Sequence, residues 1–350
     1  MIGRFVDSGI DTVVYCDSSV VDAGNVCAEV RSYTGGFCDA RDLKCIIEFI
    51  GNLEGKIAFY RDMAAVENSD ALVFSYDISQ STWDALCVSV SQSILGNVVS
   101  VNFPTFYQRV LVLECVTYRE NALKRVYALQ KECSGKLALV ISSNVRLKLF
   151  DRIGYFLAVS CINAAFELGV DIEVADHLVA NESTGVPNPG VFAILDHMGL
   201  DNFLVKLKEL IEFLENDDPL REMYKVLPYV IHAMISDELT GLNGRGGFYR
   251  TYKMRYGRVD QVIDLKSGLY RALKRDKFLQ ESVLNRKEKC DEFFSSVWGS
   301  FFKYIKYLVE LYGESVMRHI DEVLMVGYQW RYGVEELATR FSMRDLLNGD

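Results

Sequence analysis

The chain has 350 residues, of which half are hydrophobic and a quarter are charged, a composition able to bury the core of more than one domain. Its net charge of −10 excludes a protein that binds nucleic acid mainly by neutralising phosphates. The nine cysteines are scattered without a C-x-x-C pair, so we expect reduced thiols, with neither a disulfide framework nor a metal site.

The first ten residues, MIGRFVDSGI, lack the apolar core of a signal peptide. The longest apolar stretch, residues 155–166, is shorter than a helix that spans a bilayer. We therefore expect a cytoplasmic protein without a membrane span.

Short apolar runs alternate with amphipathic segments over the first 142 residues. The runs are rich in β-branched residues and lack polar alternation, which is typical of strands covered on both faces. They predict strands at residues 12–16, 44–48, 71–75, 97–101 and 111–114. Helical spacing predicts helices at 53–65 and 120–133. Strand–helix alternation of this kind predicts a mostly parallel sheet with right-handed crossovers.

Strand signals stop after Ser142, and residues 150–350 are predicted to be helical. For example, apolar residues recur at helical spacing from 203 to 214, after Asp201, a residue type favoured at helix N-caps. Residues 245–277 are locally basic and begin with a turn-rich segment, which predicts a connector between two helical parts.

The helical half contains an internal repeat. Each copy has a helix that ends in glycine, an aspartate in the following helix, and then a second glycine: Gly169, Asp176 and Gly190 in the first copy, and Gly313, Asp321 and Gly333 in the second. Glycine after a helix suits a left-handed stop. We expect the two copies to pack as related helical subdomains.

Several motifs in the helical half occur together in one known family. They are Arg152-Ile153, Gly185-Val186-Pro187 followed by Gly190-Val191-Phe192, Asp196-His197-Met198-Gly199-Leu200-Asp201, Gly246-Gly247-Phe248-Tyr249, and Gly327-Tyr328-Gln329-Trp330 with Gly333 and Glu336-Leu337. This set resembles the C-terminal domain of NAD-dependent 3-hydroxyacyl-CoA dehydrogenases, in two copies. Ile46-Ile47-Glu48 with Asn52-Leu53-Glu54 and Lys56 is similar to a motif of the family's first domain.

The resemblance implies an α/β part followed by an all-α part. We expect a degenerate, incomplete Rossmann-like NAD-binding domain at residues 1–145, with a mostly parallel sheet. One helical dehydrogenase C-terminal domain would follow at 146–270 and a second copy at 271–350. The implied activity is the oxidation of 3-hydroxyacyl-CoA to 3-oxoacyl-CoA in fatty-acid β-oxidation, with NAD as cofactor, acyl-CoA as ligand and a homodimer formed through the helical half.

In this alignment Met1 falls in the middle of the family's first helix, so we expect an N-terminally truncated member without the first strand and its phosphate-binding loop. The neighbours of that strand would have to close the gap or leave unpaired edges. Asp17 matches the acid that binds the cofactor's ribose, or is a turn-forming residue at a strand end. Lys56 matches a lysine that contacts the cofactor, or is a solvated helical lysine.

The family's general base is a histidine twelve residues before a glutamate. Glu114 matches the glutamate, and Asn102 occupies the position of the base. An amide has no available lone pair on nitrogen, so Asn102 cannot act as a base near neutral pH. Ser79 matches a serine that holds the substrate, and Asp151 stands where the family has a catalytic asparagine.

Two hypotheses follow from these replacements. The chain is a dehydrogenase that is impaired or inactive, or it is a non-catalytic family member kept as an interaction or acyl-CoA-binding module. Without a histidine to orient, Glu114 is equally well explained as a structural carboxylate. The four histidines all follow residue 170, and we expect each to be structural or solvated.

Overall fold

The computed structural model describes the chain apart from these residues: 1–11, 17–28, 33–44, 51, 66–70, 77, 79, 103, 109–110, 118, 133–136, 143–146, 255–256 and 349–350. The chain divides into two compact units. We call Met1–Pro104 with Gln108–Lys148 the α/β unit, and Thr105–Tyr107 with Leu149–Asp350 the helical unit.

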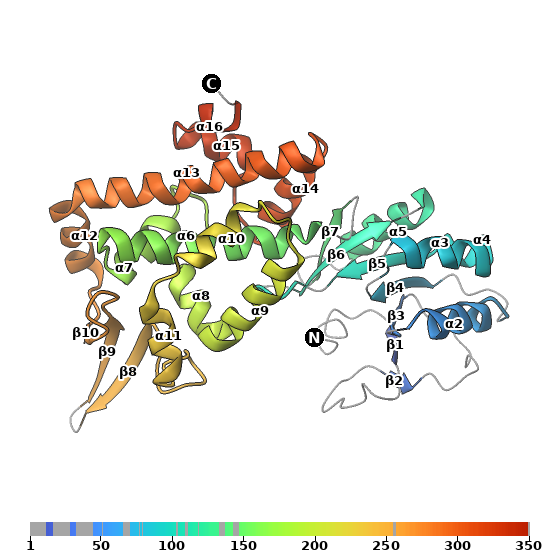
Figure 1. Cartoon of the computed structure of the whole chain (residues 1–350), viewed down its shortest axis with the longest axis horizontal. Coiled ribbons are helices and arrows are strands. Elements are labelled where there is room, and N and C mark those ends of the chain that lie inside the picture. The colour runs from blue at the N-terminus through green and yellow to red at the C-terminus, as the bar shows by residue number, and fades with distance from the viewer. Residues whose placement is uncertain are drawn as a thin grey trace. The chain divides into compact units, whose positions relative to one another are not determined.

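The α/β unit is built on a sheet whose strand order, over the described residues, is β2-β1-β3-β4-β5-β6-β7 (Figure 1). Neighbouring strands pair in parallel except for β5 and β6, which are antiparallel. The strands are β1 (Thr12–Cys16), β2 (Glu29–Ser32), β3 (Cys45–Phe49), β4 (Leu72–Tyr76), β5 (Val98–Asn102), β6 (Leu111–Thr117) and β7 (Leu137–Ser142). The predicted mostly parallel sheet is confirmed.

The predicted strands are all present, within three residues of their predicted ends. The prediction missed β2 and β7. The β2 sequence, EVRS, is short and carries charge at two positions, so it lacks the apolar signal of a buried strand. The β7 sequence, LALVIS, is an apolar run of the same kind as the strands that were predicted.

β1 pairs directly with β3, in register from Thr12 opposite Cys45 to Cys16 opposite Phe49. On its other edge β1 pairs with β2. In the dinucleotide-binding order 3-2-1-4-5-6, the second and fourth strands flank the first. In the described part of this sheet β1 and β3 are direct neighbours, and whether the family's first strand is absent stays a prediction.

Both faces of the sheet are covered at β3 and β4, as the unbroken apolar runs predicted. Ile46 and Val73 face a core completed by α2 (Leu53–Ala65), α3 (Gln80–Ser89) and α4 (Gln92–Leu95). The next residues along each strand, Ile47 and Phe74, face the opposite core, which is completed by α5 (Glu120–Glu132). Successive side chains of a strand point to opposite faces, so β3 and β4 each contribute to two cores.

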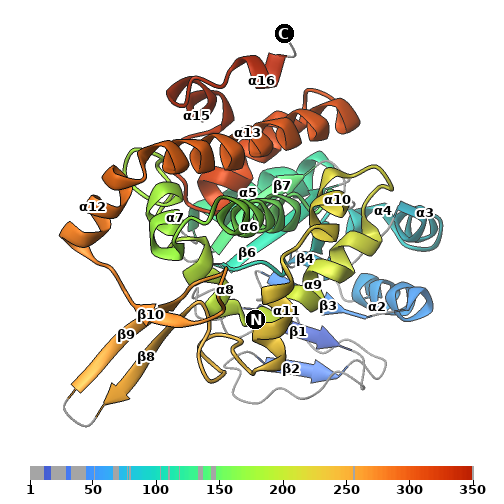
Figure 2. The ribbon, with the colours of Figure 1, turned by 60° about the vertical axis from the view of Figure 1, so that its left-hand side comes forward.

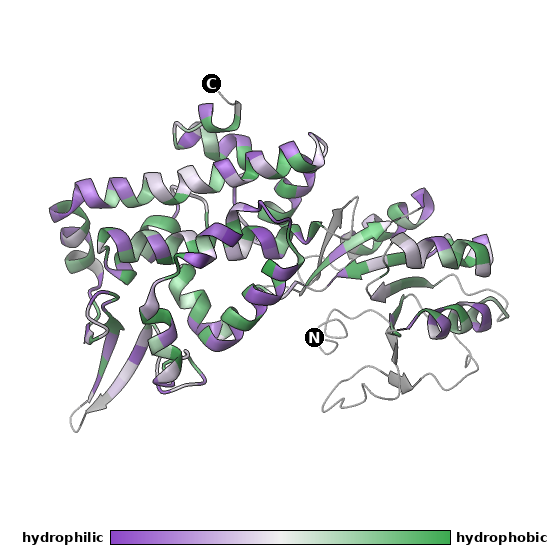
Figure 3. Ribbon diagram, viewed as in Figure 1, coloured by the Kyte–Doolittle hydropathy of each residue, from purple (hydrophilic) through white to green (hydrophobic). Residues whose placement is uncertain are grey.

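The helical unit is built from helices, several of which contact α6. The helices are α6 (Leu149–Leu168), α7 (Ile172–Val179), α8 (Val191–Met198), α9 (Leu200–Phe213), α10 (Pro219–Lys225), α11 (Tyr229–Ser236), α12 (Asp276–Asn285), α13 (Lys287–Tyr312), α14 (Val316–Glu322), the π-helix η2 (Val323–Gly327), α15 (Val334–Arg340) and α16 (Asp345–Asn348). The long helix α13 lies along α6 (Figures 1 and 2). Hydrophilic and hydrophobic residues alternate along α9 and α13, as amphipathic helices require (Figure 3).

By length and composition, α6 is the one helix among the described residues that could cross a membrane. Of its most apolar window, 89% is buried inside the helical unit. That burial is what the central helix of a globular unit shows, and the expected absence of a membrane span stays a prediction.

The internal repeat has a structural basis in helix capping. Oδ1 of Asp176 accepts a hydrogen bond from the Phe192 amide at 2.8 Å, at the start of α8. Oδ1 of Asp321 accepts one from the Val334 amide at 2.8 Å, at the start of α15. In both copies an aspartate on the second helix thus satisfies a free amide of the third, and α6-α7-α8 corresponds to α13-α14-α15. The predicted boundaries at 145 and 270 stay predictions.

The prediction that residues 150–350 are helical was wrong for part of residues 245–277, the predicted connector. They include an antiparallel sheet of β8 (Tyr249–Met254), β9 (Gly257–Ile263) and β10 (Tyr270–Ala272), in the order β10-β9-β8. Polar residues dominate these strands, and much of the sheet is exposed. The hydrophobic signal of a buried strand is therefore weak, and the glycines and basic residues suggested a loop.

Candidate functional site

The candidate base position and its glutamate lie on neighbouring strands of the α/β unit. Asn102, the last residue of β5, is paired with Glu114 of β6. Nδ2 of Asn102 donates a hydrogen bond to Oε2 of Glu114 at 3.1 Å. The antiparallel register across twelve residues therefore brings these two candidates together.

The pair can hold a position but cannot take up a proton at Asn102. A primary amide donates through its nitrogen, and it is not a base near neutral pH. Glu114 is 5% exposed and accepts this hydrogen bond. The resemblance implies that a glutamate at this position orients a histidine at residue 102. Beside it, burial and then the Glu114 charge hold the pKa of the Cys115 thiol well above its usual range, so this thiol offers no nucleophile.

Lys56 is buried inside the α/β unit, so its interpretation as a solvated lysine was wrong. The residue is 3% exposed. Its Nζ lies 2.9 and 3.0 Å from the two carboxylate oxygens of Glu48. It also donates to Ser75 Oγ at 3.2 Å and to the Tyr76 carbonyl at 2.9 Å. These partners use all three of its N–H groups.

At the carboxyl ends of β3 and β4, Glu48 also accepts hydrogen bonds from other residues. Its carboxylate accepts hydrogen bonds from the Ser75 hydroxyl, the Ile50 amide and the Tyr60 hydroxyl, the last at 3.3 Å. Burial, followed by the Glu48 charge, raises the pKa of Tyr60 well above its usual value. The Lys56 charge is thus neutralised within a closed polar cluster.

This cluster does not suit a cofactor contact by Lys56. A lysine that binds a dinucleotide must offer an N–H group and its charge to the ligand, and the side chain of Lys56 is 4% exposed. Asp17 and Ser79 lie outside the described residues, so their proposed contacts stay predictions. We therefore derive no step through NAD from Lys56.

Asp151, in the first turn of α6, is held by backbone amides of the helical unit. Its Oδ1 accepts hydrogen bonds from the Thr105 amide at 2.7 Å and the Phe106 amide at 2.8 Å. The hydroxyls of Thr105 and Tyr155 are 3.1 Å apart. Burial, followed by the Asp151 charge, raises the pKa of the Tyr155 hydroxyl, which stays protonated. In this arrangement Asp151 fixes residues 105–107 to α6.

Among the described residues, no cluster of three or more histidine, cysteine or carboxylate side chains has a geometry that could hold a metal ion. Nδ1 of His197 lies 2.8 Å from the carbonyl oxygen of Ala193, one turn earlier in the same helix. Burial, followed by the neighbouring Arg318 charge, lowers the pKa of His319. Neither imidazole is placed as a general base by these contacts.

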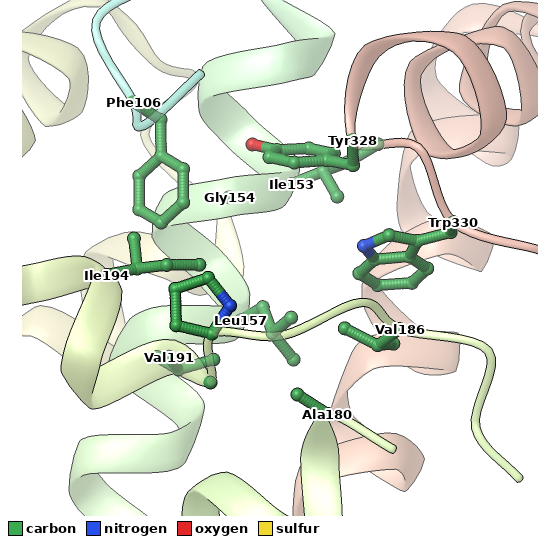
Figure 4. Close-up of a pocket in the computed structure, with 12 residues that line it drawn as sticks. Phe106, Ile153, Gly154, Leu157, Ala180, Val186, Val191, Ile194, Tyr328 and Trp330 are labelled. Carbon is green, nitrogen blue, oxygen red and sulfur yellow. The ribbon is translucent and has the colours of Figure 1, made fainter. Parts of the chain in front are cut away.

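An apolar pocket lies inside the helical unit (Figure 4). Tyr328 and Trp330 lie on one side of it, with Phe106 and Ile194 on the other. The pocket encloses about 40 Å³ of free space, and none of its lining residues is charged. A site of this chemistry accepts an apolar group.

The pocket depends on a glycine in the middle of α6. A Cβ at Gly154 would lie 2.0 Å from the Tyr328 hydroxyl and 2.5 Å from the Phe106 ring. Sequence reasoning missed the pocket as a site, although two signals were present. One is Gly154 within an apolar helix, and the other is the Gly327-Tyr328-Gln329-Trp330 motif.

Two buried carboxylates near α8 bind backbone amides of the helical unit. Asp176 accepts a hydrogen bond from the Phe192 amide and another, at 2.8 Å, from the Tyr249 hydroxyl. Asp196 accepts the Phe248 and Tyr249 amides, both at 2.7 Å. Burial is the main cause that raises the pKa of Asp176 to about 6 and that of Asp196 to about 7.

No family model matches the chain. Two curated relatives are similar to it, the putative fatty acid oxidation complex trifunctional enzymes of Rickettsia prowazekii and Rickettsia felis. Each is 24% identical over 306 residues, which covers 85% of this chain and 42% of the relative. The chain therefore spans about two fifths of the length of these relatives.

Two solved structures are similar over most of the chain. The dehydrogenase part of multifunctional enzyme 1 from C. elegans matches with a TM-score of 0.56 and 11% identity, covering 97% of this chain and 86% of that one. The 3-hydroxybutyryl-CoA dehydrogenase from Escherichia coli K12 matches with a TM-score of 0.51 and 12% identity, covering 92% and 81%.

These structures establish the class of the fold: a Rossmann-like α/β unit followed by a helical unit. The curated relatives extend the likeness to the sequence. The predicted resemblance to the 3-hydroxyacyl-CoA dehydrogenase family is therefore confirmed.

Proposed function

We propose that this chain is a 3-hydroxyacyl-CoA dehydrogenase-like protein in which the oxidation step is impaired or lost at residue 102. One observation carries the proposal: Asn102 is hydrogen-bonded to Glu114 at 3.1 Å, in the arrangement that the family resemblance implies for a histidine and its orienting glutamate.

The reaction requires a base that takes the proton of the 3-hydroxyl group. At the same time, a hydride leaves carbon 3, which carries that group. When bound, NAD supplies the acceptor for that hydride. The protein has to supply the base, and an amide at residue 102 cannot do so. Loss of a general base costs on the order of 10²–10⁴-fold in rate when the rest of a site is intact.

Two further placements favour impairment. Asp151, at the position of the family's catalytic asparagine, has a carboxylate oxygen bound to two backbone amides. Lys56, at the position of a cofactor-contacting lysine, is neutralised by Glu48. Residues that act as one catalytic unit are strongly non-additive, so repair of residue 102 alone is expected to recover little.

A second candidate function is acyl-CoA binding without oxidation. The observation that favours it is the apolar pocket, which is built independently of residues 102 and 114. A protein of this kind would hold the acyl group in its helical unit and leave the 3-hydroxyl unchanged.

The test combines turnover with binding. NADH formation from 3-hydroxybutyryl-CoA and 3-hydroxyoctanoyl-CoA is measured for the unmodified chain, for Asn102→His, and for Asn102→Gln as the matched amide control. We expect little or no NADH from any of the three. Robust turnover by the unmodified chain would refute the proposal.

Calorimetric titration with the same thioesters separates the two candidates. Binding without turnover supports the acyl-CoA-binding module, and absence of binding overturns it. A large gain from Asn102→His, with none from Asn102→Gln, would show that the rest of the catalytic site is intact and that impairment lies at residue 102 alone.

A further inference from the structure

The pocket of the helical unit is closed on one side by two aromatic residues of the second repeat. We propose that Tyr328 and Trp330 limit the acyl chain that this pocket can hold to about three to four carbon atoms. This inference rests on the proposed function, since it names the acyl group that the same protein binds.

The size of the pocket sets this limit. Its free space is about 40 Å³. A cavity needs about 10–15 Å³ of such space for one water-sized group, so there is room for about three to four groups of that size. A methylene is of similar size, and the uncharged lining offers nothing to a charged or strongly polar end.

Tyr328 is fixed in position at two points. Its hydroxyl donates a hydrogen bond to the Phe150 carbonyl of α6 at 2.7 Å. Its ring stacks on the Phe150 ring, with centroids 4.1 Å apart and an interplanar angle of 20°. A ring held at both its edge and its face does not swing aside without losing both contacts.

Trp330 is fixed as well. Its amide donates to the Leu324 carbonyl at 2.8 Å, and its ring packs edge-on against Trp298 with centroids 5.8 Å apart. Between the two aromatics, Gln329 has a φ of 58°, a left-handed conformation that is uncommon for a residue with a side chain. This turn lets residues 328 and 330 both reach the pocket (Figure 4).

Apart from Phe106, the remaining lining residues are small or aliphatic residues of the first repeat, such as Gly154, Ala180 and Val186. They leave the free space in which an apolar chain can lie. The aromatic pair therefore determines how far that chain can extend, and the second repeat contributes the specificity of a site built mainly by the first.

The experiment is a calorimetric series with acetyl-, butyryl-, hexanoyl-, octanoyl- and dodecanoyl-CoA, which lack a 3-hydroxyl. Each methylene that enters the pocket raises affinity by roughly fourfold. We expect this rise over about three to four carbons, followed by a plateau or a fall. A steady rise up to dodecanoyl-CoA would overturn the inference and leave the proposed function standing.

Tyr328→Leu removes the ring, and Trp330→Leu is the second variant. We expect either change to move the plateau to longer chains by about two to four carbons, because a leucine has about half the side-chain atoms of a tyrosine. Tyr229→Leu is the matched control, since Tyr229 is 81% exposed. Thermal melting confirms that each variant is folded.

The outcomes separate the two proposals. If neither variant moves the plateau of a folded protein, Tyr328 and Trp330 do not set the limit. If both variants unfold, the position of the plateau in the unmodified chain still decides whether the pocket is short. If no thioester binds at all, the acyl-binding function itself is overturned.

Discussion

Arg152 is a fully buried charge of the helical unit, and replacing it by methionine tests how that unit is held together. The residue lies in α6 and is 0% exposed. Its guanidinium contacts Asp218 at 3.1 Å and Glu215 at 2.5 Å, and donates to the Tyr312 hydroxyl at 2.8 Å. These contacts join α6 to the start of α10 and the end of α13.

The cost of Arg152→Met follows mainly from Asp218. This carboxylate is 0% exposed, and the substitution leaves it without its cation. Breaking a buried pair in this way costs about 3–5 kcal/mol. Asp218 keeps the Leu220 amide at 2.9 Å and the Tyr304 hydroxyl at 3.3 Å, so we expect the lower end, about 3 kcal/mol. Glu215 adds little, because its side chain is 36% exposed and can be solvated.

The assay is urea unfolding followed by tryptophan fluorescence in a Trp83→Phe background. In that background the remaining tryptophans, Trp298 and Trp330, both lie in the helical unit. With a urea dependence of about 1–3 kcal/mol per molar, a loss of about 3 kcal/mol should lower the midpoint by about 1–3 M. The matched control is Lys206→Met, which removes an exposed ion pair and should cost less than about 1 kcal/mol.

The double variant Arg152→Met with Asp218→Asn removes both charges together. We expect it to be more stable than the single variant, because the stranded carboxylate is gone. A midpoint for Arg152→Met equal to that of Lys206→Met would refute the reasoning. So would a double variant less stable than the single one, since Asp218 would then stabilise the fold without its partner.

Three further predictions concern other buried groups. Gly333→Ala places a Cβ 2.7 Å from the capping aspartate of the second repeat and should lower the free energy of unfolding by about 1–2 kcal/mol. The control is Gly299→Ala, whose Cβ has its nearest contact 3.7 Å away and which should not lower it. Equal urea midpoints for the two variants would contradict this prediction. Burial raises the pKa of Asp196 to about 7 in the folded protein, above its unfolded value, so its contribution is full at low pH and is lost as pH rises through about 7. The urea midpoint should therefore fall between pH 5 and pH 8, and Asp196→Asn should flatten that fall; an unchanged slope would disprove the assignment. Lys56→Met leaves Glu48 buried without a cation and should destabilise the α/β unit by about 3–5 kcal/mol, measured by Trp83 fluorescence; a negligible change would show that the pair is not structural.

The sequence by itself predicted the elements whose signals are local. Strand β1 and helix α2 have the predicted bounds, because a buried strand and an amphipathic helix each leave a pattern within a few residues. The pairing of Asn102 with Glu114 was expected from the family resemblance, which places the two positions twelve residues apart, and the antiparallel register of β5 and β6 brings them together. The repeated aspartate and glycine positions predicted the second helical copy, because the ends of helices also leave a local pattern.

Only the tertiary structure decided the environment of the candidate residues. Lys56 lies on a helix whose sequence is compatible with exposure, yet its partners include Ser75, 19 residues away. The pocket joins Gly154 to Tyr328, and the cation of Arg152 is bound to Tyr312, 160 residues away. Burial and charge pairing depend on which distant segments pack together, and local patterns do not carry that information. Whether a charge faces a ligand or another residue was therefore settled by the fold.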